Sequence, residues 1–261
     1  MAINQRHEDI LKILSRLRSV NVADLTERLN VSEVTIRKDL TTLEEMGLIL
    51  RTRGGAELAE DKNFLRTLNV RRKDHLEEKK AIVRRAAEFV REDDTIFIDS
   101  GSTCSLLAEA IAYRSLRVVT NSLDVMTALA DVPGITLISL GGNYRKEAGS
   151  FIGPMTEENL ESFHLEVGFV GATGFSEKGY FSAQNTIESK LKSKVLEVSK
   201  RGFVLADSSK YRNSAFSVFA RPDDVDVLIT DSRFYDSALF QSLGIEVLYG
   251  TREEEQHSEA K

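Results

Sequence analysis

Hydrophobic residues in the first sixty positions follow helical spacing. The predicted first helix, residues 5–18, carries apolar residues at intervals of three and four: Ile10, Ile13, Leu14 and Leu17. A second helix is expected over residues 22–29, and a three-residue turn that ends at Ser32 separates it from a third helix. Short helices joined in this way predict a helix-turn-helix.

The predicted third helix has an apolar face and a polar face. Ile36, Leu40 and Leu43 form the inward stripe. The other face carries hydroxyl and cationic side chains: Thr35, Arg37, Lys38, Thr41 and Thr42. The N-terminus of a helix also presents backbone N–H groups and a positive dipole end, which stabilise nearby phosphates. This face therefore suits the major groove of DNA.

A β-hairpin is predicted after the third helix. Two short strands within residues 48–58 flank Gly54-Gly55, a pair that can take the positive φ angles of a two-residue turn. Arg51 and Arg53 are two positions apart on a strand, so both side chains are expected to face the same side and to reach phosphates. The hairpin would be the wing of a winged helix-turn-helix.

Three small helices and a hairpin can also form a protein-interaction module. DNA is favoured because four cations gather where a groove would lie. The residues expected to contact DNA are Ser32, Thr35, Arg37, Lys38, Thr41, Arg51 and Arg53.

From Thr95 onward, apolar runs alternate with helical patterns. Seven runs are predicted to be strands: residues 95–98, 117–119, 136–140, 167–170, 202–206, 227–229 and 245–249. This alternation predicts an α/β domain built on a Rossmann-like, mostly parallel sheet.

Loops of small or polar residues follow these strands. Residues 99–103, Asp-Ser-Gly-Ser-Thr, precede a helix and could cradle a phosphate through backbone N–H groups and hydroxyls. Because the carboxyl ends of parallel strands meet at one edge of a sheet, these loops are expected to line one crevice. Lys210 and Lys192 are candidate partners for an anion, although Lys192 fits better as a solvated helix lysine. Arg145 beside its Gly-Gly loop could assist or lie on the surface.

The change of pattern predicts four regions: a DNA-binding domain over residues 1–60, a charged linker over 61–80, an α/β domain over 81–250 and a disordered tail over 251–261. The net charge of the 261-residue chain is −6, so contact with nucleic acid must come from a local cluster of cations.

The sequence does not indicate a disulfide, a metal or cofactor site, or a membrane span. The single cysteine, Cys104, excludes an intramolecular disulfide, and the four histidines lack metal-ligand spacing, so no metal or cofactor is expected. The sequence has no run of about 18 apolar residues, which argues against a membrane span. A cytoplasmic location is expected.

Two segments resemble the signature of the DeoR family of bacterial repressors of sugar catabolism. They are residues 31–40, Val-Ser-Glu-Val-Thr-Ile-Arg-Lys-Asp-Leu, and residues 51–56, Arg-Thr-Arg-Gly-Gly-Ala. Family members commonly have His or Tyr before the Gly-Gly, where this chain has Arg53. The strand-end loops also resemble the sensor domain of that family, whose fold is shared with ribose-5-phosphate isomerase and coenzyme A transferases.

The resemblance implies a repressor that a phosphorylated sugar or alditol releases from double-stranded operator DNA. It also implies that the Asp-Ser-Gly-Ser-Thr stretch holds the phosphate and that the other loops surround the sugar. The residues expected to bind this effector are Asp99, Ser100, Gly101, Ser102, Thr103, Asn121, Ser122, Gly141, Gly142, Ser150, Gly171, Gly174, Glu188, Asp207, Ser208 and Lys210. A homo-oligomer, dimer or tetramer, is expected because operators present repeated or palindromic half-sites.

Two alternatives remain. The chain could be a sugar-phosphate isomerase with an appended DNA-binding domain, but residues 171–175, Gly-Ala-Thr-Gly-Phe, have no acid where the isomerases carry several. Glu188 keeps catalysis possible, although no catalytic residue is assigned. An architectural DNA binder without an effector would have little need for an α/β domain of this size.

Overall fold

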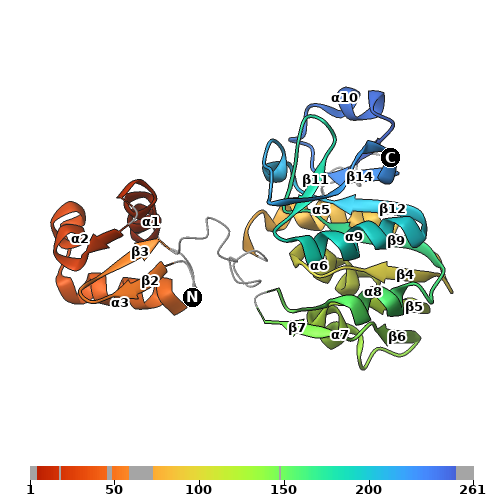
Figure 1. Ribbon diagram of the computed structural model, residues 1–261, viewed down its shortest axis with the longest axis horizontal. Helices are drawn as coiled ribbons and strands as arrows, with labels where there is room; N and C mark the ends of the chain where they lie inside the picture. The colour runs from red at the N-terminus through yellow and green to blue at the C-terminus, as the bar shows by residue number, and fades with distance from the viewer. Residues whose placement is uncertain (1–4, 18, 46–48, 59–72, 147, 251–261) are drawn as a thin grey trace, which may run out of the picture. The chain divides into compact units, whose positions relative to one another are not determined.

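The computed structural model describes residues 5–17, 19–45, 49–58, 73–146 and 148–250 (Figure 1). The chain divides into two compact units, Met1–Arg71 and Arg72–Lys261. Most of the predicted linker and the whole predicted tail lie outside the described residues.

The first unit contains three helices and a small sheet. The helices are α1 (Gln5–Leu17), α2 (Val22–Leu29) and α3 (Glu33–Glu45); the strands are β1 (Ser19–Asn21), β2 (Ile49–Thr52) and β3 (Gly55–Leu58). The sheet has the order β1-β3-β2 and is antiparallel throughout. The predicted helix-turn-helix and wing are therefore confirmed, whereas β1 was not predicted.

Apolar side chains from all three helices form the core of this unit. The inward stripe of α3 is buried as predicted, together with Ile10 and Leu14 of α1. Leu17 was expected on the same face, but 48% of its surface is exposed because α1 ends at that residue. Asn30 takes a left-handed conformation, φ 51°, which turns the chain from α2 towards α3.

The wing turn differs by one residue from the prediction. Thr52 pairs with Gly55, so the two turn residues are Arg53 and Gly54, and only Gly54 has a positive φ, 96°. Gly55 is required for another reason: a Cβ atom there would lie 2.2 Å from the carbonyl oxygen of Val20 in β1. The sequence signal did not separate a turn glycine from one that allows close packing of strands.

The second unit is built on one seven-stranded sheet. Its strands are β4 (Thr95–Ile98), β5 (Leu116–Thr120), β6 (Ile135–Ser139), β9 (Leu165–Gly171), β12 (Ser199–Leu205), β14 (Val227–Thr230) and β15 (Glu246–Tyr249). They pair in parallel in the order β15-β14-β12-β9-β4-β5-β6. All seven predicted strands lie in this sheet, which confirms the predicted fold class.

Helices cover both faces of the sheet. They are α5 (Leu76–Ala87), α6 (Ser102–Ile111), α7 (Leu123–Leu129), α8 (Pro154–Leu160), α9 (Thr186–Val198) and α10 (Ser237–Ser242). Successive residues of β4 point to opposite faces: Phe97 joins one core cluster with Leu191 of α9, and Ile98 joins the other with Leu107 of α6. The unit therefore has three layers with a core on each side of the sheet.

Two small antiparallel sheets stand beside the main one. The hairpin of β7 (Asn143–Arg145) and β8 (Ser150–Ile152) is one, and β10 (Gly174–Phe175), β11 (Phe181–Ala183) and β13 (Ser217–Ala220) form the other. None of these five short strands was predicted. Ser150, one of the residues expected to bind the effector, lies in β8.

The order of the large sheet contains a topological switch point. The chain runs from β4 to β5 and β6 on one side, then returns to place β9 on the other side of β4. Connections that leave in opposite directions open a crevice at the carboxyl ends of the two central strands, where ligands of such sheets bind. The loops after β4 and β9 therefore mark the place to look for a site.

Candidate functional site

In the first unit, α3 presents a polar surface. Ser32 caps this helix: its Oγ accepts a hydrogen bond from the backbone N–H of Thr35 at 3.3 Å. Lys38 and Thr41 are exposed, and the exposed Arg37 forms an ion pair with Glu33 one turn earlier, 2.5 Å between Nη2 and Oε1. The Thr41 hydroxyl donates to the carbonyl oxygen of Arg37 at 3.0 Å. Exposed cations and hydroxyls thus share this helix.

A buried carboxylate ties α3 to α1. Asp39 accepts hydrogen bonds from Arg6, 2.5 Å from Nε to Oδ2, and lies 3.1 Å from Nε2 of the buried His7. Burial alone would raise the pKa of Asp39, but its hydrogen bonds and charge interactions with Arg6 and His7 lower the pKa below its usual value. The interaction fixes the orientation of α3 within the unit.

The two wing arginines differ in their surroundings. The guanidinium of Arg51 donates to the carbonyl oxygen of Arg37 at 3.2 Å, and its backbone N–H donates to Oε1 of Glu44 at 3.3 Å. Arg53 is exposed at the tip of the turn. Arg53 therefore lies in the turn and not on the strand with Arg51: Arg51 joins the wing to α3, whereas Arg53 projects to solvent. Contact of both side chains with phosphates stays a prediction.

In the second unit, Asp99 follows β4 at the switch point and is buried. Its Oδ2 accepts a hydrogen bond from the backbone N–H of Gly171, which ends β9, at 3.1 Å. The same oxygen pairs with the ammonium of Lys192 from α9. Burial, followed by the charge of Asp99, raises the pKa of the neighbouring Cys104 thiol, so this cysteine stays protonated. Asp99 connects β4, β9 and α9.

Lys192 is not the solvated helix lysine that the sequence favoured. It is buried, and although burial opposes its charge, Asp99 and Glu188 raise its pKa. Its ammonium also lies 5.8 Å from the centroid of the Phe219 ring. The contacts that bury Lys192 come from strands distant in the sequence, so helical spacing alone could not reveal them.

The start of α6 has the features of an anion site. Gly101, with φ 124°, precedes the helix, and the side chains of Ser102 and Thr103 are buried in its first turn. A Cβ atom at Gly101 would have no other atom within 4 Å, so there is open space before the helix. Backbone N–H groups at the start of a helix favour a bound phosphate.

The loop after β5 contacts the β7–β8 hairpin. The backbone N–H of Phe151 donates to the carbonyl oxygen of Asn121 at 2.7 Å, and Nδ2 of Asn121 donates to the carbonyl oxygen of Phe151 at 3.2 Å. Ser122 caps α7 through its Oγ and forms a β-bridge with Ser150. Asn121 and Ser150, both expected in the site, are therefore neighbours.

An ion pair joins the hairpin to α9. Arg145 of β7 donates to Oε1 of Glu188, and both side chains are largely buried. Asn185 caps α9: its Oδ1 accepts from the backbone N–H groups of Ile187 and Glu188 at 3.1 and 2.9 Å. Asn185 was not singled out from the sequence, although an Asn three residues before a Glu is a known signal of a helix start.

The loop after β12 is held by a further carboxylate. Asp207 is buried and accepts from the backbone N–H of Ser209 at 3.1 Å, while Ser208 donates to both oxygens of Asp231. Asp231 follows β14 and was not singled out from the sequence. Lys210 ends a short 3-10 helix, Ser208–Lys210, and is half-buried.

The predicted site glycines have different roles. Gly141 and Gly142 have positive φ angles, and a Cβ atom at Gly142 would lie 2.1 Å from Oγ1 of Thr156. Gly171 ends β9 beside Asp99, whereas Gly174 is buried in β10 against the backbone of Asn213. The glycine at 174 therefore allows the close approach of the loop that contains Asn213.

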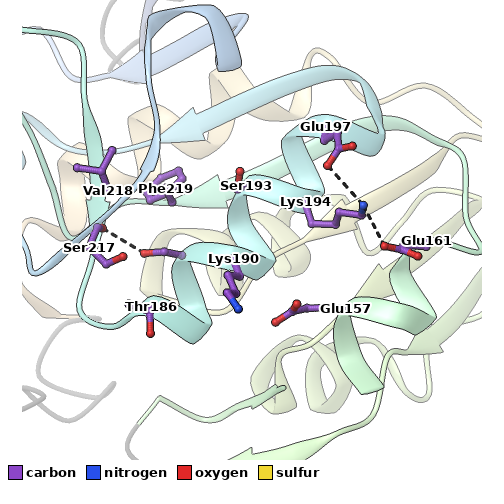
Figure 2. A pocket seen from close by; sticks show the side chains of 11 residues that line it. Glu157, Glu161, Thr186, Lys190, Ser193, Lys194, Glu197, Ser217, Val218 and Phe219 are labelled. Carbon is purple, nitrogen blue, oxygen red and sulfur yellow. Dashed lines mark hydrogen bonds and ion pairs between the residues drawn. The ribbon is translucent and has the colours of Figure 1, made fainter. Parts of the chain in front are cut away.

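A separate groove lies on another face of α9 (Figure 2). It encloses about 500 Å³ between α8, α9 and β13, and Lys190, Lys194, Glu157 and Glu161 line it. The ammonium of Lys194 is 3.0 Å from Oε1 of Glu161, so part of this charge is internally compensated. Glu188 and Lys192 do not line the groove, and it is distinct from the strand-end loops.

No group of three potential metal-ligating residues occurs among the residues with described positions. Within the same ranges, no helix has the length and apolar character needed to cross a membrane.

Comparisons with known proteins match both units. The family model described as DeoR-like helix-turn-helix domain matches residues 6–62, and the model described as DeoR C terminal sensor domain matches residues 74–232. Relatives include the repressor GlcR of Bacillus subtilis, 32% identical with 94% of this chain and 95% of that protein covered. The glycerol-3-phosphate regulon repressor of Escherichia coli is 33% identical, with 89% of this chain and 92% of the relative covered.

Another relative is the lactose phosphotransferase system repressor of Lactococcus lactis, 33% identical over 88% of this chain and 91% of that protein. Among solved structures, ribose 5-phosphate isomerase A of Methanocaldococcus jannaschii has 14% identity and a TM-score of 0.40, covering 53% of this chain and 55% of that one.

Proposed function

The chain belongs to the DeoR family of bacterial transcriptional regulators, and we propose that it represses a carbohydrate-utilisation operon until a phosphorylated sugar or sugar alcohol releases it from operator DNA. Several of the similar proteins are named as repressors, among them those of a glycerol-3-phosphate regulon and a lactose phosphotransferase system. The observation that carries the proposal is that one chain combines the exposed polar face of α3 with polar loops at the switch point of a parallel sheet.

In this proposal α3 enters the major groove. Thr35, Lys38 and Thr41 read base edges, while Ser32, Arg37 and Arg53 contact phosphates. Arg51 supports this surface by holding the wing to α3. Lys38→Ala should therefore change sequence preference as well as affinity. Unchanged affinity and preference in an anisotropy assay with a library of DNA duplexes would contradict this assignment of the recognition face.

The ligand is proposed to bind across the switch point. Its phosphate lies at the start of α6, where Ser100, Gly101, Ser102 and Thr103 supply N–H groups and hydroxyls. The sugar then extends over the neighbouring strand ends, near the other residues expected in the site: Asn121, Ser122, Gly141, Gly142, Ser150, Gly171, Glu188, Asp207, Ser208 and Lys210. Asp99 has a supporting role, because its Oδ2 is already bound by Lys192 and Gly171.

We favour a regulator over an enzyme because the carboxylates of the site are paired with cations. Asp99 is paired with Lys192 and Glu188 with Arg145, so neither is placed as an unpaired base for proton transfer. We therefore expect no isomerisation of ribose 5-phosphate by the purified full-length protein, followed by NMR. Turnover that disappears in Glu188→Gln would support the isomerase alternative instead.

The active form is proposed to be a homo-oligomer, acting in the cytoplasm where the DNA lies. The net charge of −6 leaves each chain only a small group of cations for DNA, and two or more recognition helices on repeated half-sites would supply the missing affinity. Light scattering coupled to size-exclusion chromatography tests this: a monomer at the concentration that saturates DNA would overturn it.

The decisive experiment measures DNA binding with and without sugar phosphates. DNA from upstream of the protein's own operon is titrated by fluorescence anisotropy, first alone and then with each sugar or alditol phosphate at millimolar concentration. We expect one of them to weaken DNA binding, since a ligand must bind one state better than the other in order to shift the equilibrium. If DNA affinity is unchanged by every sugar or alditol phosphate in the series, the proposed regulation is refuted.

A further inference from the structure

Four buried polar atoms in the second unit have no hydrogen-bond partner among the residues that the structure describes, and one of them, Oγ1 of Thr230, lies on β14. The other three are Oδ1 of Asn121, Oγ of Ser150 and Nδ2 of Asn185. Asn121 and Ser150 are almost completely buried. Buried polar groups in folded proteins are nearly always paired, because an unpaired one loses its hydrogen bonds to water without compensation. Three such atoms therefore indicate that another molecule supplies their partners.

The three atoms gather around the ion pair between Arg145 and Glu188. Ser150 is the direct cross-strand partner of Arg145, so the two side chains lie on the same face of the hairpin. Asn121 is hydrogen-bonded to Phe151, the residue after Ser150. On the opposite side, Asn185 caps the turn of α9 that carries Glu188. Segments far apart in the sequence thus converge on one place.

The chemistry of these groups points to hydroxyls. Asn121 offers a free acceptor, Asn185 a free donor, and Ser150 can act as either. A hydroxyl both donates and accepts, so adjacent hydroxyl groups on one ligand satisfy all three. Neither a purely donating ammonium nor a purely accepting carboxylate can do so.

The charges nearby are already balanced. Glu188 pairs with Arg145, and Asp99 pairs with Lys192. An added ammonium or carboxylate would compete with an existing ion pair and leave one buried charge uncompensated, which is costly. The site therefore disfavours amino sugars and sugar acids.

We propose that Asn121, Ser150 and Asn185, around the Arg145–Glu188 pair, form a subsite that selects the neutral, adjacent-hydroxyl part of a phosphorylated polyol. The inference rests on the proposed function and adds to it a donor residue, Asn185, and a rule of selectivity. The phosphate itself is held elsewhere, at the start of α6, so the two parts of the ligand are recognised independently.

Two substitutions remove the unpaired groups while preserving the fold. Ser150→Ala deletes a hydroxyl that has no protein partner, so the melting temperature of the ligand-free protein should stay level or rise. Asn185→Asp keeps the oxygen that caps α9 but lacks the NH₂ donor. The control is Ser189→Ala: Ser189 is also buried, but its hydroxyl donates to the carbonyl oxygen of Ser217 at 3.1 Å. This variant should lower the melting temperature and leave ligand affinity unchanged.

Isothermal titration calorimetry on the full-length protein tests the subsite. Four probes carry an uncharged polyol or sugar part and are called neutral: glycerol 3-phosphate, sorbitol 6-phosphate, glucose 6-phosphate and ribose 5-phosphate. The other probes are glucosamine 6-phosphate, 6-phosphogluconate and inorganic phosphate. We expect Ser150→Ala and Asn185→Asp each to weaken the best neutral probe about 5- to 100-fold, with inorganic phosphate binding as before.

The outcomes separate this inference from the proposed function. If a neutral polyol phosphate binds and both variants keep the wild-type affinity, the subsite is wrong and the proposed function stands. Tightest binding of the amino sugar or the sugar acid would overturn the rule of selectivity. If no sugar or alditol phosphate binds the wild-type protein, both the inference and the proposed effector are overturned.

Discussion

Replacement of Lys192 by Met should strongly destabilise the second unit. The substitution keeps the length of the side chain but leaves Asp99 buried without its cation. Removing one partner of a buried ion pair costs about 3–5 kcal/mol, because the remaining charge can neither pair nor reach water. For a domain of this size, that loss corresponds to a fall in melting temperature of about 6–20 °C. The effect needs no discount for solvent, because both side chains are buried.

Denaturation by urea, followed by far-ultraviolet circular dichroism, measures this loss; the chain contains no tryptophan for fluorescence. Lys190→Met is the control, since Lys190 is exposed on the same helix, and it should change stability by less than about 0.5 kcal/mol. The double variant Asp99→Asn with Lys192→Met should recover much of the loss, because no unpaired charge remains. If Lys192→Met alone lies within about 1 kcal/mol of wild type, the ion pair is not desolvated and the reasoning fails.

Three further predictions concern the DNA-binding unit. Because the pKa of Asp39 is lowered in the folded state, its stabilisation is present above the ordinary carboxyl pKa of 3.8 and is lost as pH falls through the lower folded value. Asp39→Asn should therefore cost about 1.5–3 kcal/mol of stability at pH 7 and should reduce the fall in melting temperature towards acid pH. A fall equal to that of the wild-type protein would contradict this. Gly55→Ala should destabilise the unit by more than about 2 kcal/mol, because the added Cβ atom would clash with β1. Gly54→Ala should cost only about 1 kcal/mol, because of the positive φ at that position. Calorimetry that finds Gly54→Ala the more destabilising variant would contradict this order. Arg53→Ala should reduce the salt slope of DNA binding by about 1 without changing the melting temperature. Arg51→Ala should lower both the salt slope and the melting temperature, because the Arg51 side chain joins the wing to α3. Equal effects of the two variants on the melting temperature would show that the wing contacts are misassigned.

The large sheet could be predicted because its strands are buried on both faces. A parallel strand between two helical layers reads as a continuous apolar run, and residues 95–98 were recognised with the bounds that the structure has. The hairpin strands β7 and β8 have three residues each and carry no such run. They pair because the loop after β5 and the helix α9 hold them in place, and contacts of that kind leave no local pattern.

The same distinction separates the predicted from the missed parts of the candidate site. The small and polar residues that follow the strands were predictable, because the geometry of a parallel sheet brings those positions together. The partners of Asp99 and Glu188 were not, since Lys192 and Arg145 come from elements whose orientation depends on packing. Asn185 is an intermediate case, because a capping pattern was present in the sequence but indicated only a helix start.

The side chains of the candidate site fall into two groups: those whose hydrogen bonds are already made within the protein, and those that keep an unpaired polar atom. Asp99 and Asp207 already have their partners within the protein, so ligand binding has little to add to their interactions. Asn121, Ser150 and Asn185 keep unused capacity, and all three lie where the β7–β8 hairpin meets the start of α9. A ligand that supplies their missing partners gains free energy at that junction, and a conformational equilibrium can shift only by as much as such differential binding allows. Under the proposed function, ligand binding would therefore act first on the hairpin and α9, which the ion pair between Arg145 and Glu188 joins.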